Sequence, residues 1–444
     1  MTPDDIKSFF ADEDDLHKED YFFLTYWFET KLDPQIQAAS LCAEMSTAQW
    51  TWKNQNRDLR LKHAAKVVHL EILEKAAGPS FRSSFSKGDS FTRCLVRIAY
   101  PRLNFEDGLP NLLTAVAGEG PFFCSGITSL KLLDIEFPES YLQHFSGPRF
   151  GIDGLRGFLN IYHRPLFLGV VKPNIGLTPE EFSEVAYSSW LGGLDIAKDD
   201  EMLGDAEWSP LETRCRLVGR KRKEAEEKTG TSKMYLANIT DEVDRLCKLH
   251  DIAVREGANA VMVNCMTIGL SAVRMLARHA AVPVVGHFVF TAAFSRLPFF
   301  GVSSVVITKL QRLCGCDLII MPGFGARMFT EEEEVLDNVD ACVESFGHVK
   351  RSLPMPAGSD WAGTLQSVSE KMRNIDFGFG CGRGVFAHPS GPEAGAQSLH
   401  QAWDAIVEKI PLEVYAEDHR ELKEAIAAFG QERAQPLKPF ISKI

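Results

Sequence analysis

The charged residues whose types and spacing suit chemistry are concentrated in one short stretch, LDIAKDDEM at residues 194–202. Lys198, Asp199, Asp200 and Glu201 follow an apolar run that is typical of a buried strand. Lys198 and Asp200 are two positions apart and therefore face the same side of a strand, while Glu201 begins the next loop. Two carboxylates and one more oxygen ligand suit a hard cation such as Mg²⁺. The alternative is a strand that simply surfaces into water.

Two further residues follow apolar runs in the same way. Lys172 lies in VVKPNIG and His287 lies in VGHFVF. Taken alone, a lysine at a strand end is usually a solvated cap, and a lone histidine is usually a satisfied core residue. The glycine-rich stretch GFGCGRG is by itself a weak phosphate signal, because tight turns also need glycine. Lys198 raises a separate question, since an ammonium group cannot bind a cation unless it loses its proton or carries an acidic modification.

The elements that must position these residues follow a regular pattern after about residue 150. We count about eight apolar strand candidates, each followed by a helix candidate, among them a helix capped by Thr178 and another capped by Thr330. This alternation predicts a (β/α)8 TIM barrel, with an open doubly wound sheet as the competing architecture. Barrel enzymes carry their reacting groups at the carboxyl ends of the strands, where Lys172, Lys198 and His287 fall.

The first 150 residues lack this regular pattern. Aromatic and alternating runs such as YFFLTYWFE and TRCLVRIAYP indicate strands, and PQIQAASLCAEMST and NLLTAVAGEG indicate helices between them. Strands and helices mixed in this way predict a small α+β domain. We therefore expect an N-terminal α+β domain over residues 1–148 and a barrel with a terminal helix over residues 149–444.

Composition excludes several classes of protein. The net charge of -12 over 444 residues argues against a nucleic-acid partner. The acidic start MTPDDIKSFF does not have the pattern of a secretory signal, and no apolar run is long enough to span a membrane. The ten cysteines form no CxxC pairs, so we expect reduced core thiols, no zinc site and a cytoplasmic protein.

The run GGLDIAKDDE resembles the second barrel strand of the large subunit of RuBisCO, and VVKPNIGL resembles the first. The resemblance extends from about residue 20 to 410 and includes EMSTAQW and GVFAHPSGPEAGA. It implies a ferredoxin-like N-terminal domain before the barrel. It also implies that Lys198, Asp200 and Glu201 hold one Mg²⁺ per subunit. In the family this lysine is carbamylated by CO₂, and the alternative here is a free amine that pairs with Asp200 and Glu201. Lys172 then corresponds to the proton-transfer lysine and His287 to the histidine that ends the fifth strand.

The resemblance also implies a phosphate site and a partner subunit. Backbone and side-chain groups around the phosphate would come from Gly358, Ser359, Gly382, Arg383, Gly384 and Arg327. The family forms homodimers whose active sites lie at the subunit interface, and Glu44 and Glu119 are the positions that reach the neighbouring subunit's site. Nothing in the sequence calls for a small subunit.

Several positions depart from the carboxylase pattern. The second lysine of the first-strand motif is Asn174, and the asparagine of the N-terminal motif is Glu119. The phosphate-binding arginine after the fifth strand is Phe288, the histidine of the sixth strand is Ile320, and the serine of the seventh is Ala357. The mobile-loop lysine falls near Arg327 in a shorter loop. These changes remove one phosphate clamp and a group associated with the carboxylated intermediate.

The whole pattern resembles the RuBisCO-like proteins, or form IV. IMPGFGARM and HFVFTAAFSRL further resemble the branch of photosynthetic sulfur bacteria and their relatives, which is linked to sulfur metabolism and oxidative stress. We therefore expect no CO₂ fixation and predict Mg²⁺-dependent enolisation or isomerisation of a phosphorylated ketose-like substrate, with or without sulfur. Lys172 would abstract the α-proton or protonate the enolate. The alternative is a binding or regulatory protein that keeps the scaffold without turnover.

Overall fold

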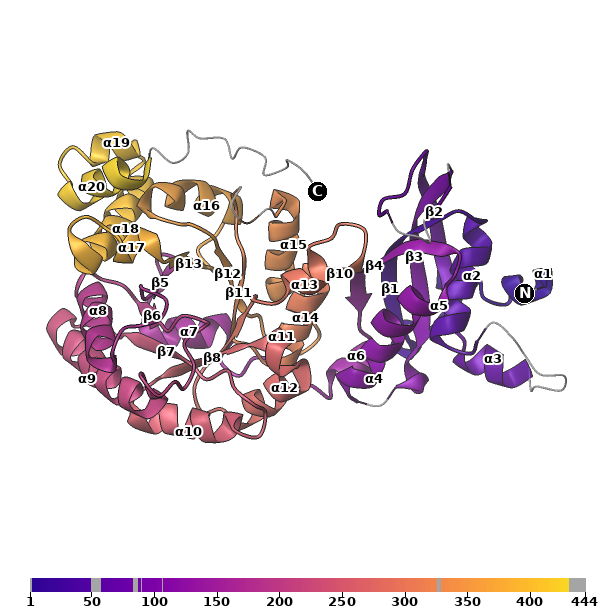
Figure 1. Ribbon diagram of the computed structural model, residues 1–444, viewed down its shortest axis with the longest axis horizontal. Helices are drawn as coiled ribbons and strands as arrows, with labels where there is room; N and C mark the ends of the chain where they lie inside the picture. The colour runs from indigo at the N-terminus through magenta and orange to yellow at the C-terminus, as the bar shows by residue number, and fades with distance from the viewer. Residues whose placement is uncertain are drawn as a thin grey trace. The chain divides into compact units, whose positions relative to one another are not determined.

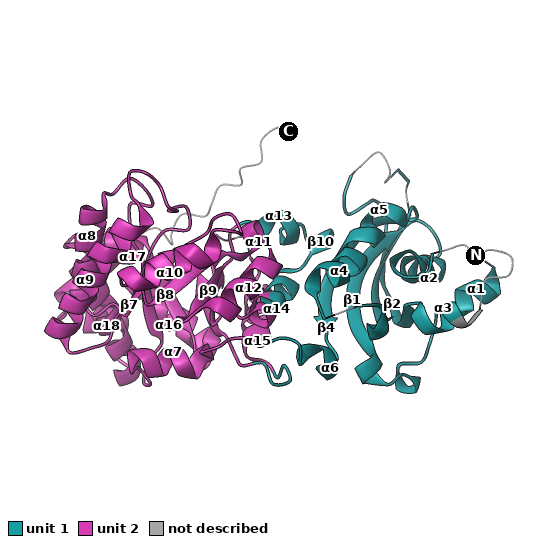
Figure 2. Cartoon of the chain, turned by 90° about the horizontal axis from the view of Figure 1, so that it is seen from below, with its two compact units in different colours: residues 1–146, 290–310, 345–349 teal, residues 147–289, 311–344, 350–444 magenta. Residues whose placement is uncertain are grey.

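The chain forms two compact units, which differ in colour in Figure 2. The computed structural model describes residues 2–48, 57–82, 87, 88, 90–105, 107–325, 328 and 330–430. Unit 1 comprises residues 1–146, 290–310 and 345–349, and unit 2 comprises residues 147–289, 311–344 and 350–444. The expected domain boundary between residues 148 and 149 stays a prediction.

Unit 1 is built on a five-stranded sheet with the order β10-β4-β1-β3-β2 (Figure 1). Its strands are β1 (Tyr21–Thr30), β2 (Lys66–Ala76), β3 (Phe91–Pro101), β4 (Ile127–Glu136) and β10 (Gly301–Val302). The long strands pair antiparallel, and only the two-residue β10 pairs parallel, with β4. The predicted strands YFFLTYWFE and TRCLVRIAYP are confirmed as β1 and β3.

Helical segments accompany this sheet and confirm the predicted α+β class for the N-terminal part. The α-helices are α1 (Pro3–Lys7), α2 (Pro34–Met45), α3 (Arg57–His63), α4 (Leu109–Leu113), α5 (Gly120–Phe123), α6 (Glu139–Leu142) and α13 (Ala292–Ser295). Short 3-10 turns cover Glu13–Asp15, Lys18–Asp20 and Arg102–Asn104. The predicted helix NLLTAVAGEG is interrupted, because Thr114–Glu119 winds as a π-helix between α4 and α5.

Unit 2 contains a closed barrel of eight parallel strands in the order β11-β12-β13-β5-β6-β7-β8-β9 (Figure 1). The strands are β5 (Leu166–Val170), β6 (Ile196–Lys198), β7 (Met234–Asn238), β8 (Ala260–Asn264), β9 (Val284–His287), β11 (Leu318–Pro322), β12 (Leu353–Ala357) and β13 (Gly378–Cys381). All eight predicted apolar runs are strands of this barrel. Closure of the sheet excludes the open doubly wound alternative.

Helices alternate with the barrel strands as the repeating pattern predicts, and the first of them, α7, precedes β5. They are α7 (Gly151–Leu159), α8 (Pro179–Leu191), α9 (Leu211–Thr229), α10 (Leu246–Glu256), α11 (Cys265–Ile268), α12 (Leu270–His279), α14 (Ser304–Cys314), α15 (Glu332–Val343), α16 (Leu365–Met372), α17 (Arg383–Phe386), α18 (Gly391–Glu408), α19 (Leu412–Tyr415) and α20 (Arg420–Phe429). A 3-10 turn, Ala362–Thr364, precedes α16. No described helix has both the length and the apolar composition needed to cross a membrane.

The two predicted helix caps have different outcomes. Thr178 caps α8 as predicted, because its hydroxyl oxygen accepts a bond from the Glu181 amide (3.2 Å) and the Glu181 carboxylate accepts one from the Thr178 amide (2.9 Å). The prediction for Thr330 is wrong. Its hydroxyl donates to the carbonyl of Met328 (3.3 Å), and α15 begins after Glu331, which makes no capping bond through its side chain.

Candidate functional site

The barrel strands present their inward side chains at every second position, and this fixes which residues reach the carboxyl-end mouth. Ala260 and Met262 of β8 belong to the packed barrel core, so Asn264 takes the next inward position. The same count from core residues of the other strands leads to a ring of polar residues on consecutive strands. The ring contains Lys172 after β5, Lys198 on β6, Asn238 on β7, Asn264 on β8 and His287 on β9.

The charged run after β6 is buried. Lys198, Asp199 and Asp200 each have an exposed fraction of 0%, which excludes the reading of this run as a strand that surfaces into solvent. Lys172 Nζ lies 2.8 Å from Oδ2 of Asp200, so the lysine after β5 and the carboxylate after β6 form an ion pair. The other oxygen of Asp200, Oδ1, accepts a hydrogen bond from the amide of Met202 (3.1 Å).

Lys198 is paired with the neighbouring carboxylate. Its Nζ donates to Oε2 of Glu201 (2.9 Å) and to the carbonyl of Asp199 (2.8 Å). Burial lowers the pKa of the Lys198 amine below its usual value, although the charge of Glu201 opposes this. Burial alone would raise the pKa of Glu201, but the charge of Lys198 together with smaller contributions, including the hydrogen bond from Lys198, outweighs it and holds that pKa at about 2.

His287 completes this cluster as a neutral ring. Its Nδ1 accepts a hydrogen bond from the amide of Val289 (3.2 Å), which places the ring proton on Nε2. Nε2 lies 3.4 Å from Oε2 of Glu201, the oxygen that Lys198 also contacts. Burial lowers the pKa of His287 to about 3, so the ring stays uncharged at neutral pH.

Asp199 faces away from the cluster. Its carboxylate accepts bonds from Nε and Nη2 of Arg214 (both 3.2 Å), from the hydroxyl of Tyr235 (2.8 Å) and from the amide of Asn238 (3.0 Å). All these partners are buried. Asp199 therefore anchors the segment that presents Lys198, whereas Asp200 faces the mouth.

Asn238, which was not among the predicted site residues, holds the loop after β6. Its Nδ2 donates to the carbonyls of Asp200 (3.4 Å), Glu201 (3.1 Å) and Leu203 (3.2 Å). Its Oδ1 accepts bonds from the amide (3.1 Å) and hydroxyl (2.7 Å) of Thr240. The alternation of side chains along the strand MYLAN would have predicted that Asn238 faces inward at the mouth.

The other half of the mouth carries no inward charged side chain on β11, β12 and β13. Ile320 belongs to the apolar core, and Ala357 packs against it. Phe288 packs against the same core, and its ring stacks on His287 with centroids 4.8 Å apart and an angle of 17°. The mouth therefore has a charged half on β5, β6 and β9 and an apolar half on β9, β11 and β12.

The glycines expected near a phosphate lie in turns after β12 and β13. The amide of Gly358 donates to Oδ2 of Asp360 (3.0 Å), and Ser359 has a positive φ of 61°. A Cβ on Gly382 would lie 3.1 Å from Cε of Lys172, which places this glycine beside the charged half.

The remaining expected site residues lie in several places. Gly384 packs against the backbone of Asp360, where a Cβ would meet the carbonyl oxygen at 2.6 Å. Arg383 lies over the ring of Phe429 (5.3 Å). Arg327 is outside the described residues. In unit 1, Glu44 is on α2 and Glu119 ends the π-helix, and both are half-buried.

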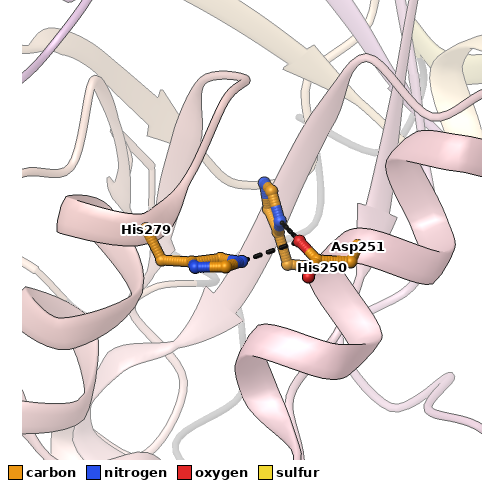
Figure 3. Close-up of side chains that lie close together, drawn as sticks. All are labelled: His250, Asp251 and His279. Carbon is orange, nitrogen blue, oxygen red and sulfur yellow. Dashed lines mark hydrogen bonds and ion pairs between the residues drawn. The ribbon is translucent and has the colours of Figure 1, made fainter.

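A second group with metal-ligand side chains lies outside the barrel mouth, on α10 and α12 (Figure 3). Oδ1 of Asp251 lies 2.9 Å from Nδ1 of His250 and 2.7 Å from Nε2 of His279. However, Nε2 of His250 accepts a bond from the amide of Ala281 (3.2 Å), so the proton of the neutral ring sits on Nδ1. A metal on Nδ1 would force a proton onto Nε2, against that amide. We interpret the group as a hydrogen-bonded contact that joins the two helices.

Known families match nearly the whole chain. The family described as "Ribulose bisphosphate carboxylase large chain, catalytic domain" matches residues 151–429, and the corresponding N-terminal domain matches residues 10–141. The ribulose bisphosphate carboxylase-like protein of Allochromatium vinosum is 56% identical over 97% of this chain and 94% of its own length. That of Chlorobaculum tepidum is 54% identical over 95% of this chain and 97% of its own length.

Solved structures agree with these sequence relatives. An octameric Rubisco of Pyrococcus horikoshii OT3 has a TM-score of 0.86 at 31% identity, covering 97% of this chain and 100% of that one. A rubisco-like protein from Burkholderia fungorum has a TM-score of 0.85 at 31% identity, covering 92% and 100%. The fold is an eight-stranded parallel barrel with a cluster of charged residues at its mouth. The matched family models and relatives show that the chain belongs to the RuBisCO large-chain family. Within that family it is a RuBisCO-like (form IV) protein.

Proposed function

We propose that this protein catalyses the Mg²⁺-dependent enolisation or isomerisation of a phosphorylated ketose-like substrate and fixes no CO₂. The observation that carries the proposal is the cluster at the barrel mouth, where Lys172 pairs with Asp200 and Lys198 with Glu201. A base, two carboxylates and a neutral histidine beside one another are the groups that proton abstraction next to a carbonyl requires.

The residues present fit a divalent cation. Oδ2 of Asp200 and Oε2 of Glu201 each face a lysine nitrogen at 2.8 and 2.9 Å, so the buried carboxylates already require positive charge beside them. Carboxylate oxygens are the ligands that Mg²⁺ prefers. Burial lowers the pKa of Lys198, and a neutral amine at this position would react with CO₂ to give a carbamate and a proton, which would supply a further oxygen ligand. Bound Mg²⁺ would stabilise negative charge on the enolate oxygen.

The protein's own groups then have separate tasks. Nζ of Lys172 takes the α-proton, and the electron pair of the broken C–H bond moves toward the carbonyl oxygen. The side chain of Lys172 is 31% exposed, so it can reach a ligand in the mouth. The amide of Val289 donates to Nδ1 of His287, so the ring proton is on Nε2. This proton can donate a hydrogen bond to an oxygen of the substrate and orient it. Lys172 returns the proton in an isomerisation.

The apolar half of the mouth supports a substrate with a single phosphate. Phe288, Ile320 and Ala357 stand where the carboxylases have phosphate-binding or polar groups, and none of the three can bind a second phosphate. The turns at Gly358 and Gly382 remain for one phosphate, together with Ser359, Arg383, Gly384 and Arg327. A role in sulfur metabolism and the response to oxidative stress, with or without sulfur in the substrate, is part of the proposal and rests on the resemblance of the sequence.

α-Proton exchange tests this proposal. The protein is incubated in D₂O with Mg²⁺, bicarbonate and a panel of ketose monophosphates, with and without a sulfur-containing end, and deuterium incorporation is followed by NMR. We expect exchange with at least one compound and its loss on chelation by EDTA. The absence of exchange throughout a broad panel would refute the enolisation proposal.

A non-catalytic binding protein is the second candidate. It is favoured because both lysines of the cluster are already paired with carboxylates, so the charges of the cluster neutralise one another without a bound ligand. A Lys198→Ala variant that retains the cellular phenotype of the wild type would favour this candidate. Loss of the phenotype together with loss of exchange would favour catalysis.

We also propose a cytoplasmic homodimer without a small subunit, in which Glu44 and Glu119 of one copy reach the barrel mouth of the other. Phe122 and Phe123, just after Glu119, are 85% and 57% exposed, and such an apolar pair needs cover. A Phe122→Glu, Phe123→Glu variant should become monomeric in light-scattering measurements. A wild-type monomer would contradict the proposal. All ten cysteines are free thiols, which supports the cytoplasmic location.

A further inference from the structure

Asn264 is the one residue of the polar ring at the barrel mouth whose hydrogen-bonding capacity is mostly unused. Its Nδ2 makes a single bond, to the main-chain carbonyl of Glu201 (3.0 Å). Its Oδ1 is buried and has no hydrogen-bond partner among the described residues. The residue as a whole is only 8% exposed. A buried acceptor without a donor destabilises a fold and calls for a functional explanation.

Asn264 does not act as a helix cap through its side chain, although it lies at a cap position. Asn264 is the N-cap residue of the short helix α11, where an asparagine usually accepts a bond from an amide of the first turn. Its side chain makes no capping bond. The cap position therefore explains why an asparagine is tolerated there but not why its amide group turns inward.

The position of Asn264 points to a ligand. It follows Ala260 and Met262 on the inward face of β8 and lies directly across from His287 in the barrel register. Among the described residues, its side chain bonds only to the main-chain carbonyl of Glu201, a residue of the charged half of the mouth. A neutral amide oxygen among these charged groups can accept a hydrogen bond at any pH, which suits a hydroxyl group.

Asn238, one strand away, is a matched contrast. It holds the corresponding inward position on β7, yet its Nδ2 donates to three carbonyls. Its Oδ1 accepts bonds from the amide and hydroxyl of Thr240. Asn238 is thus locked in place. The side chain of Asn264 is held by one bond among the described residues, and its Oδ1 accepts none.

We propose that Asn264 is a substrate-binding and specificity-determining residue, whose Oδ1 accepts a hydrogen bond from a hydroxyl group of a hydroxylated ketose phosphate. The inference rests on the proposed function for the class of ligand. It adds a contact on β8 between the charged groups and His287, and this contact selects for a hydroxyl at the substrate carbon that faces β8.

The experiment compares Asn264→Leu with Asn238→Leu in two measurements. The first is the melting temperature of the protein without ligand. We expect Asn264→Leu to melt within about 2 °C of the wild type, because one lost bond is offset by removal of the unpaired acceptor. Asn238→Leu should melt at least about 4 °C lower, because it loses five bonds. Equal decreases in melting temperature in the two variants would overturn the proposal and show that Asn264 has a structural role.

The second measurement is the affinity for D-ribulose 1-phosphate in the presence of Mg²⁺, with Mg²⁺ alone as a control. We expect Kd to rise about tenfold in Asn264→Leu, which corresponds to one hydrogen bond to an uncharged group, with no change in the affinity for Mg²⁺. An unchanged Kd for the ketose phosphate, or a weaker affinity for Mg²⁺ alone, would overturn the assignment to a substrate hydroxyl. Failure of the wild type to bind this compound would also overturn the assignment, whereas the proposed enolisation is judged separately, by α-proton exchange over the whole panel of ketose monophosphates.

Discussion

At the scale of single residues, the site depends on how buried charges are shared. Lys172 and Lys198 each neutralise one carboxylate, Asp200 or Glu201, and His287 is kept neutral by burial. A buried charge that loses its partner is far more costly than an exposed one. The variants that matter at this scale therefore remove one member of a pair, and each needs a control of the same chemical type.

The ion pair between Asp199 and Arg214 leads to the first prediction. Arg214→Met leaves Asp199 buried without its counterion, so the free energy of unfolding should fall by about 3–5 kcal/mol. Urea denaturation measures this change. Arg216→Met is the matched control, since Arg216 is exposed on the same helix, and it should alter stability by less than about 0.5 kcal/mol. Similar losses in both variants would show that Asp199 does not depend on Arg214.

At the scale of elements, the sequence predicted the barrel because apolar runs such as LFLGV and AVMVN alternate with helices, and parallel strands covered on the outside need that pattern. The cluster at the mouth was found because Lys198 and Asp200 are close in sequence. The pairing of Lys172 with Asp200 could not be found in this way, since it joins the ends of two neighbouring parallel strands, β5 and β6, and the two residues are 28 positions apart in the sequence. The Thr330 cap failed because α15 begins one residue later than expected, so that Glu331 and not Thr330 holds the cap position.

Asparagine is common at strand ends and gives no charge signal, and for this reason Asn238 and Asn264 escaped the sequence analysis. Their roles depend on where their amide groups point, which only the packed structure determines. Counting every second position from Leu236 and Met262 would have placed both at the mouth. It would not have shown that one is saturated with hydrogen bonds and the other is not.

The strand β7 begins next to a buried lysine that leads to a prediction about pH. Burial lowers the pKa of Lys233 from 10.5 to about 8, and its Nζ donates to the carbonyl of Leu194 (2.9 Å). Between these pH values the unfolded chain binds more protons than the folded one, so the contribution of this lysine to the free energy of unfolding rises with pH. The rise should amount to at most about 3 kcal/mol.

Urea denaturation at pH 7.5 and at pH 9.5 checks this prediction. The wild type should gain stability relative to Lys233→Met as the pH rises, and the exposed Lys223→Met should follow the wild type. A Lys233→Met variant with the same pH dependence as the wild type would contradict the assignment.

At the scale of the whole molecule, the ten cysteines predict a simple labelling pattern. Nine are buried, and only Cys247 is half-exposed. A buried thiol is hard for a reagent to reach, and burial also raises the pKa of the Cys94 thiol to about 11, so that it stays protonated and reacts slowly. A thiol reagent such as DTNB should therefore label about one cysteine per native chain and ten after unfolding in guanidinium chloride. Cys247→Ser should abolish the native labelling, and several reactive thiols in that variant would contradict the packing described.

The whole molecule combines the scaffold of a carboxylase family with a mouth that is charged on one side and apolar on the other. The charged side supports enolisation, and Phe288, Ile320 and Ala357 on the apolar side are the reason to expect no carboxylation of a bisphosphate. These two statements are separable by experiment. Purified protein should incorporate no labelled CO₂ into ribulose bisphosphate, and measurable incorporation would contradict the second statement without affecting the first.

The central claim is that Lys172 moves the α-proton of a ketose phosphate. Its most direct test is the rate of deuterium incorporation from D₂O in the presence of Mg²⁺ and bicarbonate, compared between the wild type, Lys172→Met and the exposed control Lys223→Met. The account predicts exchange in the wild type and in Lys223→Met, and a loss of about 100-fold or more in a folded Lys172→Met, in the range that a positioned proton-transfer group supplies. Equal exchange by Lys172→Met and the wild type would contradict the claim.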